Sequence, residues 1–179
     1  MYLELGTTRF DITTRALVMG ILNRTPDSFF DGGEYWSFDD FIRQAETLVE
    51  EGADFLDVGG VKAGPGPEVT VEEEMERVVP AIAALSARFD LPISVDTFRA
   101  SVLQESLNAG ACVGNDISGF ADPAFLEVAA RHSASVVATH VRIGPRIADP
   151  APIYGDVRGD VTDFLRVRAG WAQAAGIPN

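Results

Sequence analysis

Five short apolar segments recur along this chain, and each ends at or beside a polar side chain. The polar residues at these ends are Asn23, Asp57, Asp96, Asn115 and His140. Continuous apolar runs of this length are typical of strands that are buried on both faces, as in a parallel sheet. The carboxyl ends of parallel strands meet on one side, so we expect these polar side chains to gather there. The segments are residues 17–22, 55–58, 93–96, 112–115 and 135–140.

Segments with helical spacing of apolar residues separate the predicted strands. The predicted helix caps are Ser37, Thr70, Thr97, Asp122 and a position near residue 154 or 156, and the predicted stops include Gly52, Gly110 and Gly176. Ser37 and Thr70 each precede an acidic residue three positions later, which is typical of a capping box. Pro80 would cost about 3 kcal/mol inside an unbroken helix, so we expect a kink or a restart there. The last helix is expected to bury Val157, Val161, Phe164, Leu165 and Trp171.

The alternation of strands and helices predicts an α/β fold, the TIM (β/α)8 barrel, present here as its N-terminal five or so β/α units. Residues 2–12 alternate apolar and polar positions around Gly6, which predicts a hairpin at the bottom of the barrel. Residues 1–179 are expected to form one domain, because no linker or charge block divides them. Five units cannot close an eight-stranded barrel, so we expect open strand edges and a homo-oligomer.

The charge of the chain narrows the range of its partners. The 179 residues carry 14 basic and 27 acidic side chains, a net charge of −13. Nucleic acids and anionic membranes both reward clusters of Lys and Arg, so neither is an expected partner. A small-molecule ligand is expected instead. No apolar run approaches the ~18 residues of a membrane span and no secretory signal is recognisable, so the expected location is the cytoplasm.

Few residues can fill the usual catalytic roles. Lys62 is the only lysine, Cys112 the only cysteine, and His132 and His140 are the only histidines. Cys112 lies in an apolar run, which is typical of a core residue in a reducing compartment. Zinc sites built on several His and Cys ligands are excluded.

Three alternative sites are weaker than the strand ends. The glycine-rich stretch 59–66 lacks the spacing of G-x-G-x-x-G and is not followed by G-K-[ST], so it does not predict a nucleotide loop. Lys62 in this stretch is expected to be solvated and protonated, which argues against a Schiff base. A triad of Ser28, His140 and Asp96 lacks the G-x-S-x-G nucleophile elbow.

Asp96 and Asn115 are the strongest candidates for chemistry. They lie at the ends of neighbouring predicted strands, within an apolar mouth. A carboxylate beside a carboxamide suits a planar ligand edge that carries both N–H donors and a carbonyl-like acceptor. Either residue alone is explained as well by a helix cap or a loop hydrogen bond. The pair at the active end of a barrel favours a binding site.

Five stretches of the chain form a pattern of their own. They are NRTPDSFFDGG, DVGGVKAGPG with the following EEE and RVVP, SVDTFRA, AGACVGNDISG and ATHVRIGP. In order and spacing they resemble dihydropteroate synthase, the pterin-binding barrel enzyme of folate synthesis, over nearly the whole chain. The resemblance implies a transferase that condenses 6-hydroxymethyl-7,8-dihydropterin diphosphate with 4-aminobenzoate and releases diphosphate with help from Mg²⁺.

The resemblance also implies roles for residues matched by position. Asp96 and Asn115 resemble the catalytic, pterin-binding pair, and Ile117 resembles a further pterin contact. Asn23 resembles the residue that binds Mg²⁺ and diphosphate, and its carbonyl oxygen is a ligand type that Mg²⁺ accepts. An ionised Asp96 is expected to stabilise positive charge that spreads into the pterin as the C–O bond breaks. The remaining loop contacts with the substrates are implied for Thr25, Asp31, Ala63 and Gly64.

Two departures separate this chain from the family pattern. The family has Thr-Arg where this chain has Ala63 and Gly64, and a small apolar residue where it has Arg24. In these respects the chain resembles the divergent second copies of the family. The alternatives are therefore a non-catalytic pterin-binding or scaffold protein and, less favoured, a methyltetrahydrofolate-dependent methyltransferase. The family's later pterin carboxylate, lysine and Arg-x-His anion site are expected beyond residue 179.

Overall fold

The computed structural model describes residues 1–25 and 37–178. The strands are β1 (Tyr2–Leu5), β2 (Thr8–Asp11), β3 (Met19–Asn23), β4 (Phe55–Gly59), β5 (Ile93–Asp96), β6 (Val113–Asp116) and β7 (Ser135–Ala138). The helices are α1 (Phe38–Glu50), α2 (Val71–Arg88), α3 (Ala100–Asn108), α4 (Pro123–Arg131) and α5 (Val157–Ala174). Strands β3 to β7 form a five-stranded parallel sheet in chain order. Each of them begins and ends within two residues of the predicted segment.

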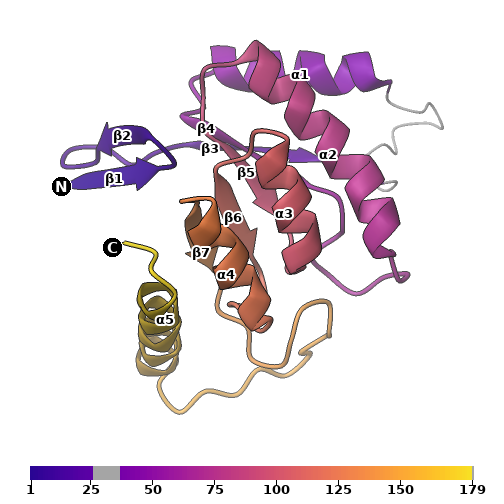
Figure 1. Ribbon diagram of the computed structural model, residues 1–179. Coiled ribbons are helices and arrows are strands. Elements are labelled where there is room, and N and C mark those ends of the chain that lie inside the picture. The colour runs from indigo at the N-terminus through magenta and orange to yellow at the C-terminus, as the bar shows by residue number, and fades with distance from the viewer. Residues whose placement is uncertain (26–36, 179) are drawn as a thin grey trace.

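The sheet is wound in a single direction. Every strand pairs with the next strand of the sequence, and Figure 1 shows α1 to α4 following the sheet along one side. A doubly wound sheet would instead reverse its strand order at a switch point. The progressive order is that of a barrel wall and confirms the predicted β/α units.

The apolar core lies between the sheet and these helices. Alternate strand residues point to opposite faces, so Leu22, Val58 and Val95 face the helices and are fully buried. Burial of each such side chain stabilises the fold by about 1.5–3 kcal/mol. The residues between them face the inner side of the sheet, where the polar strand ends lie.

The predicted hairpin is confirmed, and it covers the amino ends of the last two strands. Strands β1 and β2 pair antiparallel around Gly6, whose φ of 59° requires the left-handed region. The Gly6 N–H donates to Ser135 Oγ at 3.1 Å, and the Ser135 hydroxyl donates to the Glu4 carbonyl at 3.0 Å. A Cβ on Gly6 would lie 2.7 Å from Cys112 Cβ, so the turn packs directly on this residue.

Most of the predicted helix ends are confirmed. The Ser37 hydroxyl accepts from the Asp40 N–H, and the Asp40 carboxylate accepts from the Ser37 N–H, which completes a capping box. The Thr70 hydroxyl accepts from the Glu73 N–H at 3.1 Å. Asp122 caps α4, with proline at the first helical position.

Two details of the helices differ from the expectations. Thr97 does not cap α3, because its hydroxyl accepts from the Arg99 N–H before the helix begins at Ala100. Of the kink or restart expected at Pro80, the restart does not occur, because helix α2 runs from Val71 to Arg88. Ala81 and Ile82, directly after the proline, are fully buried against the core. Their burial offsets the cost of about 3 kcal/mol for proline in a helix.

The predicted burial of α5 is also wrong in part. Val157, Leu165 and Trp171 are exposed, and Ala172 is the only residue of α5 classed as buried. The helix follows β7, which is the edge strand of the sheet. In the described part of the chain no further strand lies beyond β7 for this helix to pack on. Phe164 makes the main aromatic contact, edge-on to His140 with ring centroids 4.9 Å apart.

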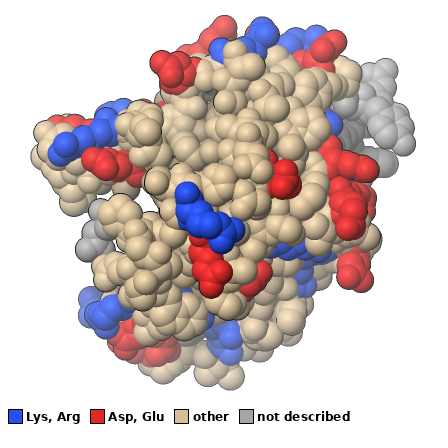
Figure 2. Space-filling view, in the orientation of Figure 1, with Lys and Arg blue, Asp and Glu red and all other residues tan. Residues whose placement is uncertain are grey.

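Charged side chains of both signs are scattered over the surface. Figure 2 shows acidic and basic side chains interspersed on the face that carries the helices. Several of them form ion pairs, such as Arg15 with Asp54 at 2.6 Å, and exposed pairs of this kind contribute at most about 1 kcal/mol each. No helix in the described part of the chain has the length and apolar character needed to cross a membrane.

Candidate active site at the carboxyl ends of the strands

Four residues at the carboxyl ends of the strands lie in one row across the sheet. Asn23 is in register with Gly59, Gly59 with Asp96, and Asp96 with Asn115. Residues in register on parallel strands point to the same face, so the three polar side chains converge on the inner side. The predicted convergence of Asn23, Asp96 and Asn115 is therefore confirmed.

Gly59 allows the neighbouring side chains to approach each other. A Cβ at this position would lie 3.0 Å from Asn23 Oδ1 and 3.6 Å from Asp96 Oδ2. Both polar side chains thus lean over the glycine from the two adjacent strands. Any larger residue here would displace at least one of them.

Asp57 supports Asn115 from one layer deeper. It precedes Gly59 by two positions, so it points to the same face, and it is only 4% exposed. The Asn115 amide donates to both Asp57 carboxylate oxygens, at 3.3 and 3.4 Å. The NH₂ group of Asn115 is therefore bonded to Asp57. The amide oxygen of Asn115 can still accept a hydrogen bond from a ligand.

The electrostatics of the row centre on Asp96. Burial, and then the nearby carboxylates Asp57, Glu74 and Asp116, raise the pKa of Asp96 from 3.8 to about 7. A like charge close by disfavours the ionised form, and burial acts in the same direction. The sequence led us to expect an ionised Asp96. With a pKa of about 7, this carboxyl is instead divided between its two forms near neutral pH.

Asp116 points to the opposite face and shapes the loop that carries Ile117. Its carboxylate accepts from the Ser118 N–H at 2.6 Å and from the Phe120 N–H at 2.9 Å. These bonds hold the turn after β6, where Phe120 has a φ of 64°. The turn places Ile117 in the lining of the cavity beside Asp96.

A small cavity lies between Asp96 and the loop that follows β4. Its lining includes Lys62, Ala63, Glu74, Asp96, Ile117 and Arg146. Ala63 presents only a methyl group to this space, and a Cβ added at Gly64 would meet no atom within 4 Å. Ala63 and Gly64 therefore offer no polar side chain to a ligand on this side of the site.

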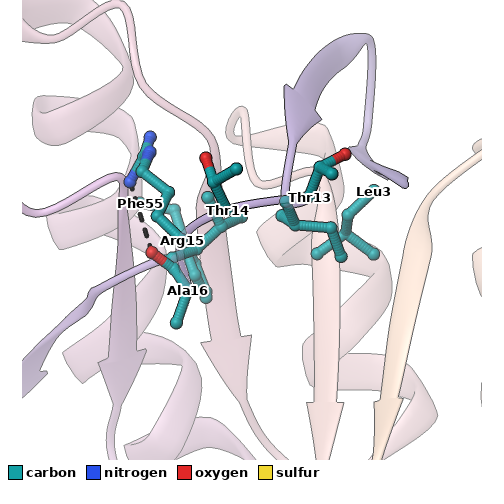
Figure 3. A pocket seen from close by; sticks show the side chains of 8 residues that line it. Leu3, Thr13, Thr14, Arg15, Ala16 and Phe55 are labelled. Carbon is teal, nitrogen blue, oxygen red and sulfur yellow. Dashed lines mark hydrogen bonds between the residues drawn. The ribbon is translucent and has the colours of Figure 1, made fainter.

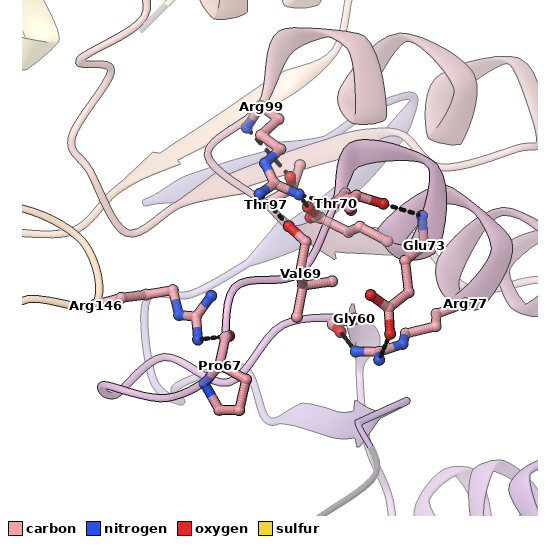
Figure 4. Close-up of polar contacts among 10 residues, drawn as sticks. Gly60, Pro67, Val69, Thr70, Glu73, Arg77, Thr97, Arg99 and Arg146 are labelled. Carbon is pink, nitrogen blue, oxygen red and sulfur yellow. Dashed lines mark hydrogen bonds and ion pairs between the residues drawn. The ribbon is translucent and has the colours of Figure 1, made fainter.

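Three arginines hold this loop by its backbone carbonyls, as Figure 4 shows. Arg77 donates to the Gly60 carbonyl at 2.7 Å, Arg99 to the Val69 carbonyl at 2.6 Å, and Arg146 to the Pro67 carbonyl at 2.5 Å. The three bonds fix the loop at its start, through Gly60, and at two points of its second half, through Pro67 and Val69.

Glu74 links this loop to the strand-end row. It is fully buried and accepts from Arg99 at 2.6 Å. Burial raises the pKa of Glu74, and the neighbouring Thr97 and Arg99 oppose that rise. The buried pair joins α2 to the segment that follows Asp96 and so sets one wall of the cavity.

Arg24, the second departure, points away from the row. Its guanidinium lies over the rings of Phe38 and Phe41, at 5.5 and 5.3 Å from their centroids. Burial, and then the charge of Arg77, lowers the pKa of Arg24. This residue therefore packs against α1.

The other predicted residues are only partly placed. Thr25 is buried at the end of the described segment, at 6% exposure. Asp31 and Ser28 lie outside the described residues. His140 packs against Phe164 and Tyr154. The three members of the alternative Ser28 triad are thus not all described.

A larger hollow lies at the opposite end of the strands, beneath the hairpin. Figure 3 shows it lined by Leu3, Thr13, Thr14, Arg15, Ala16 and Phe55. Phe55 is the first residue of β4, so this hollow faces the amino ends of the strands. Barrel enzymes build their sites at the carboxyl ends, so the hollow is not the candidate active site.

The order of the strands and the polar row agree with a known family. A family model described as "Pterin binding enzyme" matches residues 19–179. The chain belongs to this family. It is 45% identical to the dihydropteroate synthase of Synechocystis sp. over 177 residues, covering 98% of this chain and 61% of that relative. It is 42% identical to the dihydropteroate synthase of Escherichia coli strain K12 over 161 residues, covering 89% of this chain and 57% of that relative.

Solved structures of the pterin-binding enzyme family agree with this assignment. Yersinia pestis dihydropteroate synthase in complex with a sulfonamide drug matches with a TM-score of 0.89 and 40% identity, covering 99% of this chain and 64% of that one. Xanthomonas albilineans dihydropteroate synthase with 4-aminobenzoic acid matches with a TM-score of 0.86 and 39% identity, covering 99% and 63%. The predicted TIM barrel fold is thus confirmed, and the chain covers only part of it. It spans about 60% of the length of these relatives.

Two contacts of the candidate site could not be predicted from the sequence. Asp57 was noted as a polar strand end, but its contact with Asn115 depends on register across the intervening strand β5. The only available signal was its spacing of two from Gly59. Arg146 was not singled out, because its partner Pro67 is 79 residues away in the sequence.

Proposed function

We propose that this chain carries the pterin-binding part of a dihydropteroate synthase-type transferase site. The reaction would condense 6-hydroxymethyl-7,8-dihydropterin diphosphate with 4-aminobenzoate and release diphosphate. The observation that supports this proposal best is the row of Asn23, Gly59, Asp96 and Asn115 in register at the strand ends. A row of this kind presents a carboxylate and an amide oxygen to one flat ligand edge.

Asp96 and Asn115 would bind the pterin edge, with Ile117 against the ring. The ionised Asp96 accepts from two adjacent N–H groups, and the Asn115 oxygen accepts from a third. Hydrogen bonds to the ionised form lower the pKa of a carboxyl, so ligand binding should shift Asp96 towards its charged state. That charge would then stabilise the positive charge that develops on the pterin as the C–O bond breaks.

Asn23 fits the role of a single protein ligand to Mg²⁺. Its Oδ1 leans over Gly59 towards the inner face, where only the absence of a Cβ leaves room for it. In the described part of the chain no cluster of three His, Cys, Asp or Glu side chains could hold a metal. Mg²⁺ commonly takes one or two protein oxygens and completes its shell with water and substrate phosphates. The chemistry it supplies when bound is neutralisation of the negative charge on the leaving diphosphate.

A second candidate function is pterin binding without synthase turnover. The row presents Asp96 and Asn115 to a pterin edge, whereas Ala63 and Gly64 offer no side-chain donor to an acceptor substrate. The loop backbone is nevertheless held in place by Arg77, Arg99 and Arg146. A scaffold or binding role needs only the first half of the site.

We further infer a cytoplasmic, self-associating protein. Ile21 on β3 and Val137 on β7 are 53% and 41% exposed, and these two strands form the edges of the sheet. Unpaired edges with exposed apolar residues favour association with another chain. The single partly buried thiol of Cys112 supports a reducing compartment.

Calorimetric titration with 6-hydroxymethylpterin tests the pterin assignment. Asp96→Asn should weaken binding by ~2–5 kcal/mol, because it removes the charge from a buried hydrogen-bonded contact. The matched control is Asp90→Asn, which removes an exposed carboxylate just before β5. It should leave the affinity unchanged. Equal affinity of the wild type and the Asp96→Asn variant would show that the row does not bind pterin.

A further inference from the structure

A second row of residues lies directly beneath the strand-end row and points to the same inner face. It is formed by Ile21, Asp57, Ser94 and Val113, which are in register on neighbouring strands. Such interior layers of a barrel are filled mostly by branched apolar side chains. Asp57 departs from that pattern, since it is an acidic residue that is only 4% exposed. Burial of a carboxylate is unfavourable, so packing alone does not account for this residue.

The hydrogen-bond partner of Asp57 is Asn115, which lies two strands away. Strand β5 runs between them, and its inward residue in register with Asp57 is Ser94, which is small and only 1% exposed. Asn115 Nδ2 lies 3.4 Å from Asp57 Oδ1 and 3.3 Å from Asp57 Oδ2, so the NH₂ group faces the middle of the carboxylate. Burial raises the pKa of Asp57, and its contacts with Ser94 and Asn115 oppose that rise.

An ionised carboxylate allows only one orientation of the Asn115 amide. A carboxamide has a donor end and an acceptor end, whereas a carboxylate has acceptors alone. Rotated by half a turn, the amide would direct its oxygen at the two Asp57 oxygens and leave all three without a donor. Asp57 therefore holds the NH₂ group and keeps the Asn115 oxygen turned towards the ligand. A neutral amide in place of Asp57 would both donate and accept, so it would hold either orientation.

We propose that Asp57 is a positioning residue that sets the ligand specificity of the site through Asn115. It fixes the amide so that a ligand edge with an N–H group at Asn115 binds, and an edge with a carbonyl oxygen there is rejected. The inference rests on the pterin-binding function proposed above and adds the residue that selects 2-amino over 2-oxo pteridines. A site whose buried polar groups require a donor discriminates strongly against an analogue that lacks it.

Two ligands that differ at this edge test the proposal by calorimetric titration near neutral pH. The first, 6-hydroxymethylpterin, has a 2-amino group, and the second, 6-hydroxymethyllumazine, has a carbonyl oxygen in its place. The measured quantity is the ratio of the two affinities, in which the wild type should favour the pterin. Asp57→Asn should lower this ratio about ten-fold, because the Asn115 amide can then turn and donate to the lumazine.

A change in the ionisation of Asp96 cannot imitate this result. The charge of Asp57 is one of the causes that raise the pKa of Asp96. Removing that charge favours the ionised Asp96, which accepts from the amino group of the pterin. This side effect would raise the ratio, so a fall in the ratio reports the orientation of Asn115.

A second variant and a second background show whether Asp57 acts through Asn115. Asp57→Leu removes the carboxylate but keeps a branched side chain, and it should lower the ratio as well. Asp57→Asn added to Asn115→Ala should change the ratio by less than about two-fold, since no amide remains to be oriented. The matched control is Asp54→Asn, just before β4. The Asp54 carboxylate accepts from Arg15 at 2.6 Å and from the Val18 N–H at 2.8 Å, so its loss should lower stability in urea and leave the ratio unchanged.

The outcomes separate this inference from the function on which it rests. A ratio that stays at the wild-type value in both Asp57→Asn and Asp57→Leu would overturn the positioning role, even though both ligands bind. A fall of the same size in the Asn115→Ala background, or in the Asp54→Asn control, would assign the effect to a general loosening of the sheet and would also overturn it. If the wild type binds neither ligand, the pterin-binding function itself fails.

Discussion

Replacing Asp96 by Asn should stabilise the folded chain at neutral and alkaline pH, although it should weaken ligand binding. Burial and the neighbouring carboxylates raise the pKa of Asp96 from 3.8 to about 7. Between these values the folded chain holds a proton that the unfolded chain has released, so the free energy of unfolding falls as the pH rises. The loss of stability caused by ionising Asp96 is absent below about pH 4 and complete above about pH 7. Asparagine cannot ionise and avoids it.

The size of the effect follows from the same two pKa values. A shift from 3.8 to about 7 corresponds to at most ~4 kcal/mol, at about 1.4 kcal/mol per unit. The side chain is only partly buried, so water screens some of this energy and we expect ~2–4 kcal/mol. The carboxamide has nearly the same shape as the protonated carboxyl, so packing should differ little between the two at low pH.

Urea denaturation of the wild type, Asp96→Asn and Asp90→Asn between about pH 4 and pH 8.5 measures this difference. The stability gained by Asp96→Asn should be near zero at the acid end, grow through the interval and level off above about pH 7. The exposed Asp90→Asn control should show no such growth. A gain that does not change with pH, or a loss of stability at the alkaline end, would refute the assigned electrostatics.

Two further predictions concern the loop and the sheet edges. Sulfonamides and 4-aminobenzoate should bind weakly to the wild type, and the double substitution Ala63→Thr with Gly64→Arg should recover about 1.5–3 kcal/mol of sulfonamide affinity by calorimetry, since the open space at Gly64 admits the side chain. Strong sulfonamide binding by the unmodified loop would contradict this account. Light scattering should show the chain self-associating at low micromolar concentration, because Ile21 and Val137 are exposed on the two edge strands. Ile21→Lys should reduce that association, and a wild type that stays monomeric would disprove it.

The fold and the centre of the site could be predicted because both follow from local sequence. Apolar runs with helical segments between them leave few arrangements other than a parallel sheet. Once the strands are parallel, Asn23, Asp96 and Asn115 must end on the same side. The caps at Ser37 and Asp122 are equally local, since each bonds to a backbone group within three residues.

The errors arose where non-local contacts decide the structure. Thr97 has the sequence signal of a cap, but its N–H donates to the Asn115 carbonyl and extends the sheet pairing, which delays the helix. The apolar face of α5 has helical spacing, yet whether it is buried depends on neighbours that the pattern cannot specify. The ionisation state of Asp96 depends on carboxylates from three other elements.

The strand-end row and the loop after β4 depend on different features of the fold. Recognition of the pterin edge depends on strand-end residues whose positions the sheet register fixes, so it can persist while the loops change. The loop after β4 depends instead on its backbone, which three arginines hold at the carbonyls of Gly60, Pro67 and Val69. Ala63 and Gly64 take no part in these bonds, so substitutions at the two positions can alter the chemistry of the loop without altering its shape. A change of ligand preference on this side therefore requires no change of fold.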